Sequence, residues 1–203
     1  MANSGLMRWS GLAAILAAGL LSVGALLSLA TESENLSVSA TTPSYAFSSL
    51  LYLLGGVLLL LGLVGLYLRQ SGPSGTLGLV AFLVAFLGTT LAVGATWAEL
   101  FVAPALAVEA PRVLDAEPTG MLALGFTLTF FVFLPLGWLL FGVASYRARI
   151  YPRVATILLM VGAVIAALPI PLTEIVLYVG VAWLGFVLFT ERGETVQQPM
   201  RVR

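Results

Sequence analysis

Residues 47–98 decide the fold class of this chain: FSSLLYLLGGVLLLLGLVGLYLRQSGPSGTLGLVAFLVAFLGTTLAVGATWA. They contain two mostly apolar runs, 47–68 and 77–98, which are separated by the short polar stretch RQSGPSGT. A run of roughly 20 apolar residues is long enough to cross the hydrocarbon core of a bilayer as a helix. Each run therefore predicts a transmembrane helix, and the stretch between them predicts a short turn.

Four further segments meet the same criterion, at residues 9–30, 121–145, 154–168 and 172–190. The composition agrees with this, because 60% of the residues are hydrophobic and 9% are charged, whereas a soluble domain carries about 25% charged residues. The chain is predicted to be an all-α integral membrane protein, a bundle of six transmembrane helices. It would form a single transmembrane domain over residues 1–203 that ends in a short cytoplasmic tail at 191–203.

The charged residues are divided unequally between the two ends of the predicted helices. All nine basic residues are arginine, and only Arg112 falls in a connection on the opposite side from the rest. Since basic residues in short loops are retained in the cytoplasm, both termini are predicted to be cytoplasmic, which an even number of spans requires. The use of arginine without lysine is typical of a GC-rich bacterial or archaeal genome, so we expect a multi-pass protein of a prokaryotic plasma membrane.

Residues 9–30 also fit a secretory signal peptide, because Arg8 precedes an apolar run that ends in Ser28-Leu29-Ala30. The run is longer than the usual core of a signal peptide, so we expect it to remain as a helix. Cleavage would instead leave five spans and an N-terminus outside the cell.

The connections on the far side from most arginines are longer than the others. Within the connection after the third helix, residues 100–108 are apolar enough to form a short interfacial helix or a re-entrant segment. The turn Pro169-Ile170-Pro171 is tight, which predicts that the fifth and sixth helices are antiparallel neighbours.

A faint internal repeat relates residues 58–70 to residues 137–149. The matched pairs are Leu60 with Leu139, Leu61 with Leu140, Val64 with Val143, Tyr67 with Tyr146, and Pro73 with Pro152. The second and third helices would then repeat as the fourth and fifth in a parallel duplication. The alternative is that two arginine-flanked helical hairpins in lipid have similar compositions.

Two acidic residues, Glu99 and Glu174, come close to membrane depth and map to the outer boundary of their helices. They could share an outer mouth, where a pair of carboxylates could bind a cation or hold one proton between them. Arg112 is the expected protein counter-ion. The alternative for Glu174 is that Thr173 caps the sixth helix and Glu174 favours its positive end, and for Glu99 it is ordinary solvation at the interface.

Pro135 lies inside the fourth predicted helix and predicts a kink, because proline lacks a backbone donor and clashes with the preceding turn. Thr127 and Thr129 lie upstream and could satisfy the freed carbonyls. Such a kink either lines a cavity or is a packing feature. These three residues complete the candidate ligand-binding set, together with Glu99, Glu174 and Arg112.

Small residues recur at helical spacing on several predicted helices. The longest stripe is Gly78, Ala81, Ala85 and Gly88, and shorter ones are Ala14 with Ala18 and Gly162 with Ala166. Small faces let helix backbones approach closely, which favours association in lipid. The stripes predict a compact bundle.

The residues that the chain lacks argue against an enzyme. It has no lysine, histidine or cysteine, and Asp115 is its one aspartate. A Schiff base, ordinary haem or zinc ligation and a serine nucleophile with its usual base are therefore excluded, and we expect no catalytic residue, metal or cofactor. No basic cluster indicates nucleic acid.

The leading hypothesis is therefore a membrane protein without catalytic chemistry. It would be an accessory or scaffold subunit, or a binder of a lipid or other hydrophobic molecule, with membrane lipid or other membrane protein subunits as partners. The alternative is a small transporter or channel that uses Glu99 and Glu174. A continuous polar cavity that reaches the middle of the membrane would favour transport, and a dry, packed interior would favour a scaffold.

Overall fold

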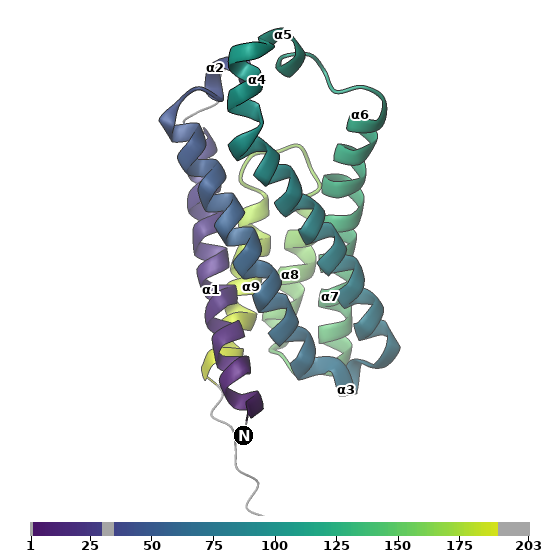
Figure 1. Ribbon diagram of the computed structural model, residues 1–203. Helices are drawn as coiled ribbons and strands as arrows, with labels where there is room; N and C mark the ends of the chain where they lie inside the picture. Colours follow the sequence, from purple (N-terminus) through teal and green to yellow (C-terminus); the bar gives the residue numbers. More distant parts are fainter. Residues whose placement is uncertain (1, 30–34, 191–203) are drawn as a thin grey trace, which may run out of the picture.

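The computed structural model describes residues 2–29 and 35–190, and within these ranges the regular elements are all helical. In chain order they are α1 (Ala2–Leu29), α2 (Leu36–Ser39), α3 (Pro43–Phe101), α4 (Ala103–Glu109), α5 (Pro111–Leu114), α6 (Gly120–Thr127), η1 (Leu128–Phe133), α7 (Leu134–Ala148), α8 (Arg153–Ile165) and α9 (Glu174–Thr190) (Figure 1). The prediction of an all-helical chain is confirmed for this part. The expected tail at 191–203 and the signal-peptide cleavage point after Ala30 lie outside the described residues.

Three helical stretches in the described ranges are long and apolar enough to cross a membrane. They are Gly5–Leu29, Pro43–Phe101 and Gly120–Ala148, and the last combines α6, η1 and α7. Two shorter apolar helices, Arg153–Ile165 and Glu174–Thr190, pack with them. The helices therefore have the length and composition of a membrane protein.

The long helix α3 is a hairpin, because its direction reverses at Gly75. The backbone there has φ 54° and ψ −146°, which is outside the helical region and open to glycine. The rings of Tyr67 and Phe82 stack with their centroids 4.4 Å apart, although a straight helix would separate these residues by about 22 Å. The first arm (43–74) and the second arm (76–101) therefore run antiparallel, as the descending and returning halves of α3 do in Figure 1.

The small-residue stripe of the second arm is an interface between helices, as predicted. All four members are buried: Gly78, Ala81, Ala85 and Gly88. A Cβ atom added to Gly88 would lie 2.6 Å from the backbone nitrogen of Leu134, and one added to Gly137 would meet the backbone of Ala85. The second arm and α7 are therefore in backbone contact, which is how small residues hold helices together in lipid.

Small residues also allow α1 to pack closely on the first arm and on α9, and α8 to pack closely on α9. A Cβ atom added to Gly62 in the first arm, or to Gly185 in α9, would lie 2.8 Å from the Cβ atom of Ala14 in α1. Gly162 of α8 meets the backbone of Leu177 in α9. The predicted pairing of these last two helices as neighbours is confirmed.

A turn of π-helix, Leu128–Phe133, lies just before Pro135, where the sequence predicts a kink. The Leu134 N–H donates to the carbonyl of Thr129, five residues back, and this wider turn adjusts the hydrogen-bond ladder just before the proline. The prediction for Thr129 needs correction, because its hydroxyl donates at 2.8 Å to the carbonyl of Gly125, upstream of the carbonyls that the proline affects. The side chain of Thr127 is exposed.

Polar contacts tie the bundle together at both ends. At the end that carries α2, the N–H and hydroxyl of Ser37 donate to the two carboxylate oxygens of Asp115 at 2.8 Å and 2.7 Å. These bonds lower the pKa of Asp115. At the end that carries Gly75, the Tyr151 hydroxyl donates at 3.1 Å to the carbonyl of Leu66, and the Arg69 guanidinium lies over the Tyr151 ring at 5.3 Å.

Candidate functional site

A cavity of about 660 Å³ opens into the half of the bundle near α2. Its walls come from α1, α2, both arms of α3, the η1–α7 junction and α9. The connection between α8 and α9 closes the remaining side. The helix α8 ends at Ile165, and the residues after it line the cavity: Ala166, Leu168 and Pro169. A volume of this size is within the range of small-molecule sites, about 300–1,000 Å³.

The cavity extends from the α2 end to about the middle of the bundle. Glu99 lies in the last turn of the second arm, and Thr89 of the same arm lines the cavity about 15 Å away at 1.5 Å per residue. Half the hydrocarbon thickness of a bilayer is also about 15 Å. At this depth the fully buried Trp138 donates its indole N–H to Thr89 Oγ1 at 3.2 Å, and the two side chains form a floor.

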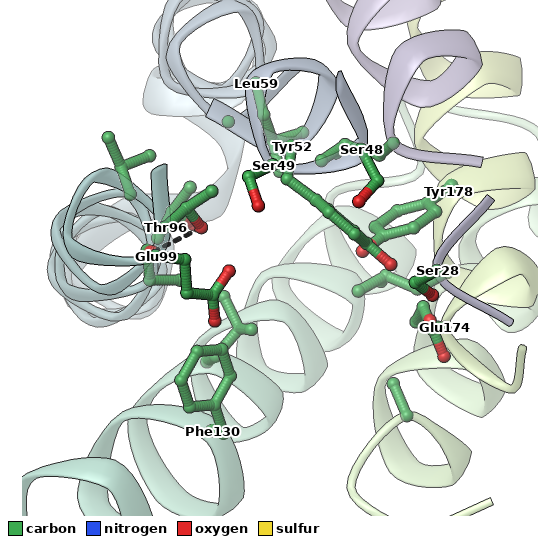
Figure 2. Close-up of a pocket in the computed structure, with 18 of the residues that line it drawn as sticks. Ser28, Ser48, Ser49, Tyr52, Leu59, Thr96, Glu99, Phe130, Glu174 and Tyr178 are labelled. Carbon is green, nitrogen blue, oxygen red and sulfur yellow. Dashed lines mark hydrogen bonds between the residues drawn. The ribbon is translucent and has the colours of Figure 1, made fainter. Parts of the chain in front are cut away.

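Both predicted carboxylates line this cavity, so the fold brings Glu99 and Glu174 together around one space. They stand on opposite sides of it, with Tyr52 between them (Figure 2). Tyr52 interacts electrostatically with both carboxylates. Tyr45 interacts in the same way with Glu99, and Tyr178 with Glu174. The two carboxylates therefore belong to one site but lie on opposite sides of it and are not bonded to each other.

Neither carboxylate has a protein partner within residues 2–29 and 35–190, since neither forms a hydrogen bond or an ion pair there. The Thr173 hydroxyl, the expected cap of α9, donates at 2.8 Å to the carbonyl of Ile170. Glu174 does lie in the first turn of α9, where its charge favours the positive end of the helix.

Of the other predicted site residues, one lines the cavity and three do not. Pro135 lines the cavity beside Leu134. Arg112 is exposed in the short helix α5, which packs on α2 and α4, and is not among the lining residues. The role of Arg112 as a counter-ion stays a prediction. Thr127 and Thr129 also lie off the lining, because their stretch of helix turns these side chains elsewhere.

Sequence reasoning missed the polar face at the start of the first arm. Tyr45, Ser48, Ser49 and Tyr52 all line the cavity, and they are spaced as one face of a helix. A stripe of hydroxyl groups at the spacing i, i+3, i+4 and i+7 in an otherwise apolar helix was the available signal. Tyr178 of α9 faces the same space, but no pattern in the sequence pairs it with the first arm.

The deepest part of the cavity is mainly apolar, and most of its polar groups lie nearer the α2 end, where apolar residues such as Leu36 and Phe130 also line it (Figure 2). Leu21, Leu59 and Trp138 supply hydrocarbon and ring surface, while the tyrosines, serines and carboxylates supply polar groups nearer the α2 end. The residues described contain no group of three or more acidic, histidine or cysteine side chains that could hold a metal ion. This geometry can hold a molecule that has an apolar part and a polar part.

Comparison of the chain with protein-family models, with curated proteins and with solved structures gives no match. The function is therefore inferred from the side chains of the cavity and from the physical chemistry of the bundle.

Proposed function

We propose that this protein binds a lipid or another amphiphilic molecule in the cavity, without catalysing a reaction on it, as a six-span protein of a prokaryotic plasma membrane. The observation that carries the proposal is that the floor of the cavity is mainly apolar and that its carboxylates, tyrosines and serines gather in the upper wall. A hydrocarbon chain fits the floor, and a polar head group fits the upper wall. Such a binder would act on its own or as the ligand-binding subunit of a larger membrane assembly.

The positions of the ends of the bundle support the proposed topology. Arg8, near the start of α1, lies 5.6 Å above the ring of Phe189, near the end of α9, so these two ends lie at the same end of the bundle as Gly75 (Figure 1). An even number of crossings requires this arrangement. The arginines at that end favour the cytoplasm, and the α2 end would then face outside. Reporter fusions at the C-terminus and at residue 40 should report opposite compartments, and finding both in one compartment would contradict the topology.

The absence of catalytic chemistry is supported by the composition of the cavity. The chain has no histidine, lysine or cysteine to act as a base or nucleophile. The two carboxylates stand on opposite sides of the cavity with Tyr52 between them (Figure 2). These groups can bind and orient a ligand, and binding is the activity that we assign to them.

The proposal is tested by filling the cavity from one wall. Ala92 lines the cavity, whereas its neighbour Leu91 is exposed on the outer surface of the same arm. Ala92→Phe should reduce both the lipid that copurifies with the protein, measured by native mass spectrometry, and the binding of added dodecanol. Leu91→Phe is the matched control and should leave both unchanged.

Two results would overturn the proposal. One is that the wild-type protein retains no hydrophobic molecule and binds no dodecanol. The other is that Ala92→Phe, folded as judged by its melting temperature, binds dodecanol as tightly as wild type.

A second candidate function is cation-coupled transport, which the presence of Glu99 and Glu174 on one cavity favours. The cavity does reach about the middle of the bundle, but its polar side chains do not continue past Trp138, and Leu63 and Leu66 of the first arm are fully buried beyond it. The lack of a continuous polar path favours binding over transport. In liposomes a transporter would show a cation- or proton-dependent flux. Loss of that flux in folded Glu99→Gln or Glu174→Gln protein would promote this second function.

A further inference from the structure

We infer that the cavity selects a long-chain amine, a molecule with a hydrocarbon tail and a positively charged amino group. This inference rests on the proposed function, because it names the class of ligand for the same cavity. Three features of the lining support it: the sign of its charges, the aromatic rings around them and the apolar floor beneath.

The charges on the lining are of one sign. Glu99 and Glu174 both face the cavity, and no arginine is among the lining residues that the structure describes. Neither carboxylate is engaged in an ion pair or a hydrogen bond with any other described residue. A cationic head group could form ion pairs with both carboxylates, whereas a phosphate or carboxylate head group would lie between two like charges. The charge pattern therefore excludes the common anionic and phosphate-bearing lipids as preferred ligands.

The aromatic rings of the upper wall add a second preference for a cation. Tyr45, Tyr52 and Tyr178 line the same part of the cavity as the carboxylates, and Tyr52 feels the charge of both. The face of an aromatic ring attracts a nearby cation, and this attraction strengthens when the cation is shielded from water. Tyrosine hydroxyls also accept hydrogen bonds, so an ammonium group can be held by carboxylates and hydroxyls together.

The hydrocarbon tail cannot provide the selectivity. Leu21, Leu59 and Trp138 make an apolar floor, but a tail that leaves the bilayer for this floor exchanges one apolar surroundings for another and gains little. The free energy that distinguishes one amphiphile from another must then come from the head group. Because carboxylates and phenols line the part of the cavity where the head group would lie, an amine is the head group that the site binds most favourably.

The test compares three ligands that share one tail. Dodecylamine, dodecanol and dodecanoate are titrated at neutral pH into the purified full-length protein, in a nonionic detergent that has no alkyl chain, by isothermal calorimetry. Hydrogen bonds to charged groups contribute enough that dodecylamine should bind about tenfold more tightly than dodecanol. Dodecanoate should bind more weakly than dodecanol.

Carboxylate variants identify the groups responsible. Glu99→Gln and Glu174→Gln should each reduce the preference for dodecylamine over dodecanol at least several-fold. Glu109→Gln is the matched control, because Glu109 is exposed in α4 and lies off the cavity. It should keep the wild-type preference.

The outcomes separate this inference from the proposed function. Equal affinity for dodecylamine and dodecanol, or tighter binding of dodecanoate, would overturn the amine inference and leave a cavity that binds amphiphiles without regard to charge. Binding of none of the three would overturn the proposed function and the inference with it. A preference that persists unchanged in both carboxylate variants would also refute the inference. The comparison of ligands uses wild-type protein, so it stands even where a variant fails to fold.

Discussion

The contact between the second arm of α3 and α7 predicts that the same substitution, glycine to alanine, lowers the unfolding free energy at one position of the arm and raises it at another. A Cβ atom added to Gly88 would lie 2.6 Å from the backbone carbonyl carbon of Phe133 and from the backbone nitrogen of Leu134. Neither atom belongs to a flexible side chain, so Gly88→Ala must push the two helices apart. Such overpacking costs about 1–3 kcal/mol, while replacing a helical glycine by alanine gains about 0.5–1 kcal/mol. Because backbone atoms cannot rotate away, the upper part of the overpacking range applies, and the expected net loss of unfolding free energy is about 1–2 kcal/mol.

Gly94→Ala is the matched control, because Gly94 lies in the same arm and an added Cβ atom there would meet nothing within 4 Å. It should stabilise the helix by about 0.5–1 kcal/mol. Thermal unfolding in detergent, followed by circular dichroism, measures both changes. For a chain of this size each kcal/mol moves Tm by about 2–4 °C, so Gly88→Ala should melt roughly 2–8 °C below wild type and Gly94→Ala slightly above it. If Gly88→Ala is as stable as wild type or more so, the close contact with α7 is refuted.

Three further predictions test other contacts. Ala85→Leu, at the same interface, should lower the unfolding free energy by about 1–3 kcal/mol in the same assay, and a neutral result would place Ala85 against lipid. Trp138→Phe removes the 3.2 Å hydrogen bond to Thr89 and should cost about 1 kcal/mol, measured as a lower Tm. Because hydrogen bonds from Ser37 lower the pKa of Asp115, their stabilisation of the connections at the α2 end is fully present above the unfolded pKa of about 3.9 and is lost as pH falls through the lower folded pKa. Limited proteolysis across this acidic range should show the connections loosening in wild type and no such pH dependence in Asp115→Asn.

Local patterns in the sequence were enough to predict the helices. Apolar runs of membrane length recur along the chain, and a helix in lipid must satisfy its backbone hydrogen bonds internally. The polar stretch 69–76 predicted the reversal that the structure has at Gly75. The stripe from Gly78 to Gly88 predicted a buried interface, because small residues at helical spacing serve little purpose against lipid.

The candidate site was predicted only in part. The sequence selected Glu99 and Glu174 because acidic residues are rare near membrane depth, and both line the cavity. It also selected Arg112, which is not among the lining residues; the position of a short helix in a long connection depends on contacts that hydropathy does not describe. It also gave Pro135 a kink without foreseeing the π-helical turn at Leu128–Phe133, because the choice between hydrogen-bond registers depends on how the neighbouring helices pack.

The sequence by itself determined that this chain forms apolar helices, where most of them begin and end within a few residues, and which faces are small enough for close packing. The start of α1 is an exception, because the helix begins at Ala2 and not near residue 9. Those properties depend on neighbours along the chain, through hydropathy and helical spacing. Only the tertiary structure decided that Tyr45 and Tyr52 of the first arm, Glu99 of the second arm, and Glu174 and Tyr178 of α9 surround one cavity. These residues are far apart in the sequence, and their meeting depends on the rotation of each helix about its axis and on the early end of α8. Packing between helices sets both quantities, since lipid accepts any apolar face that turns toward it.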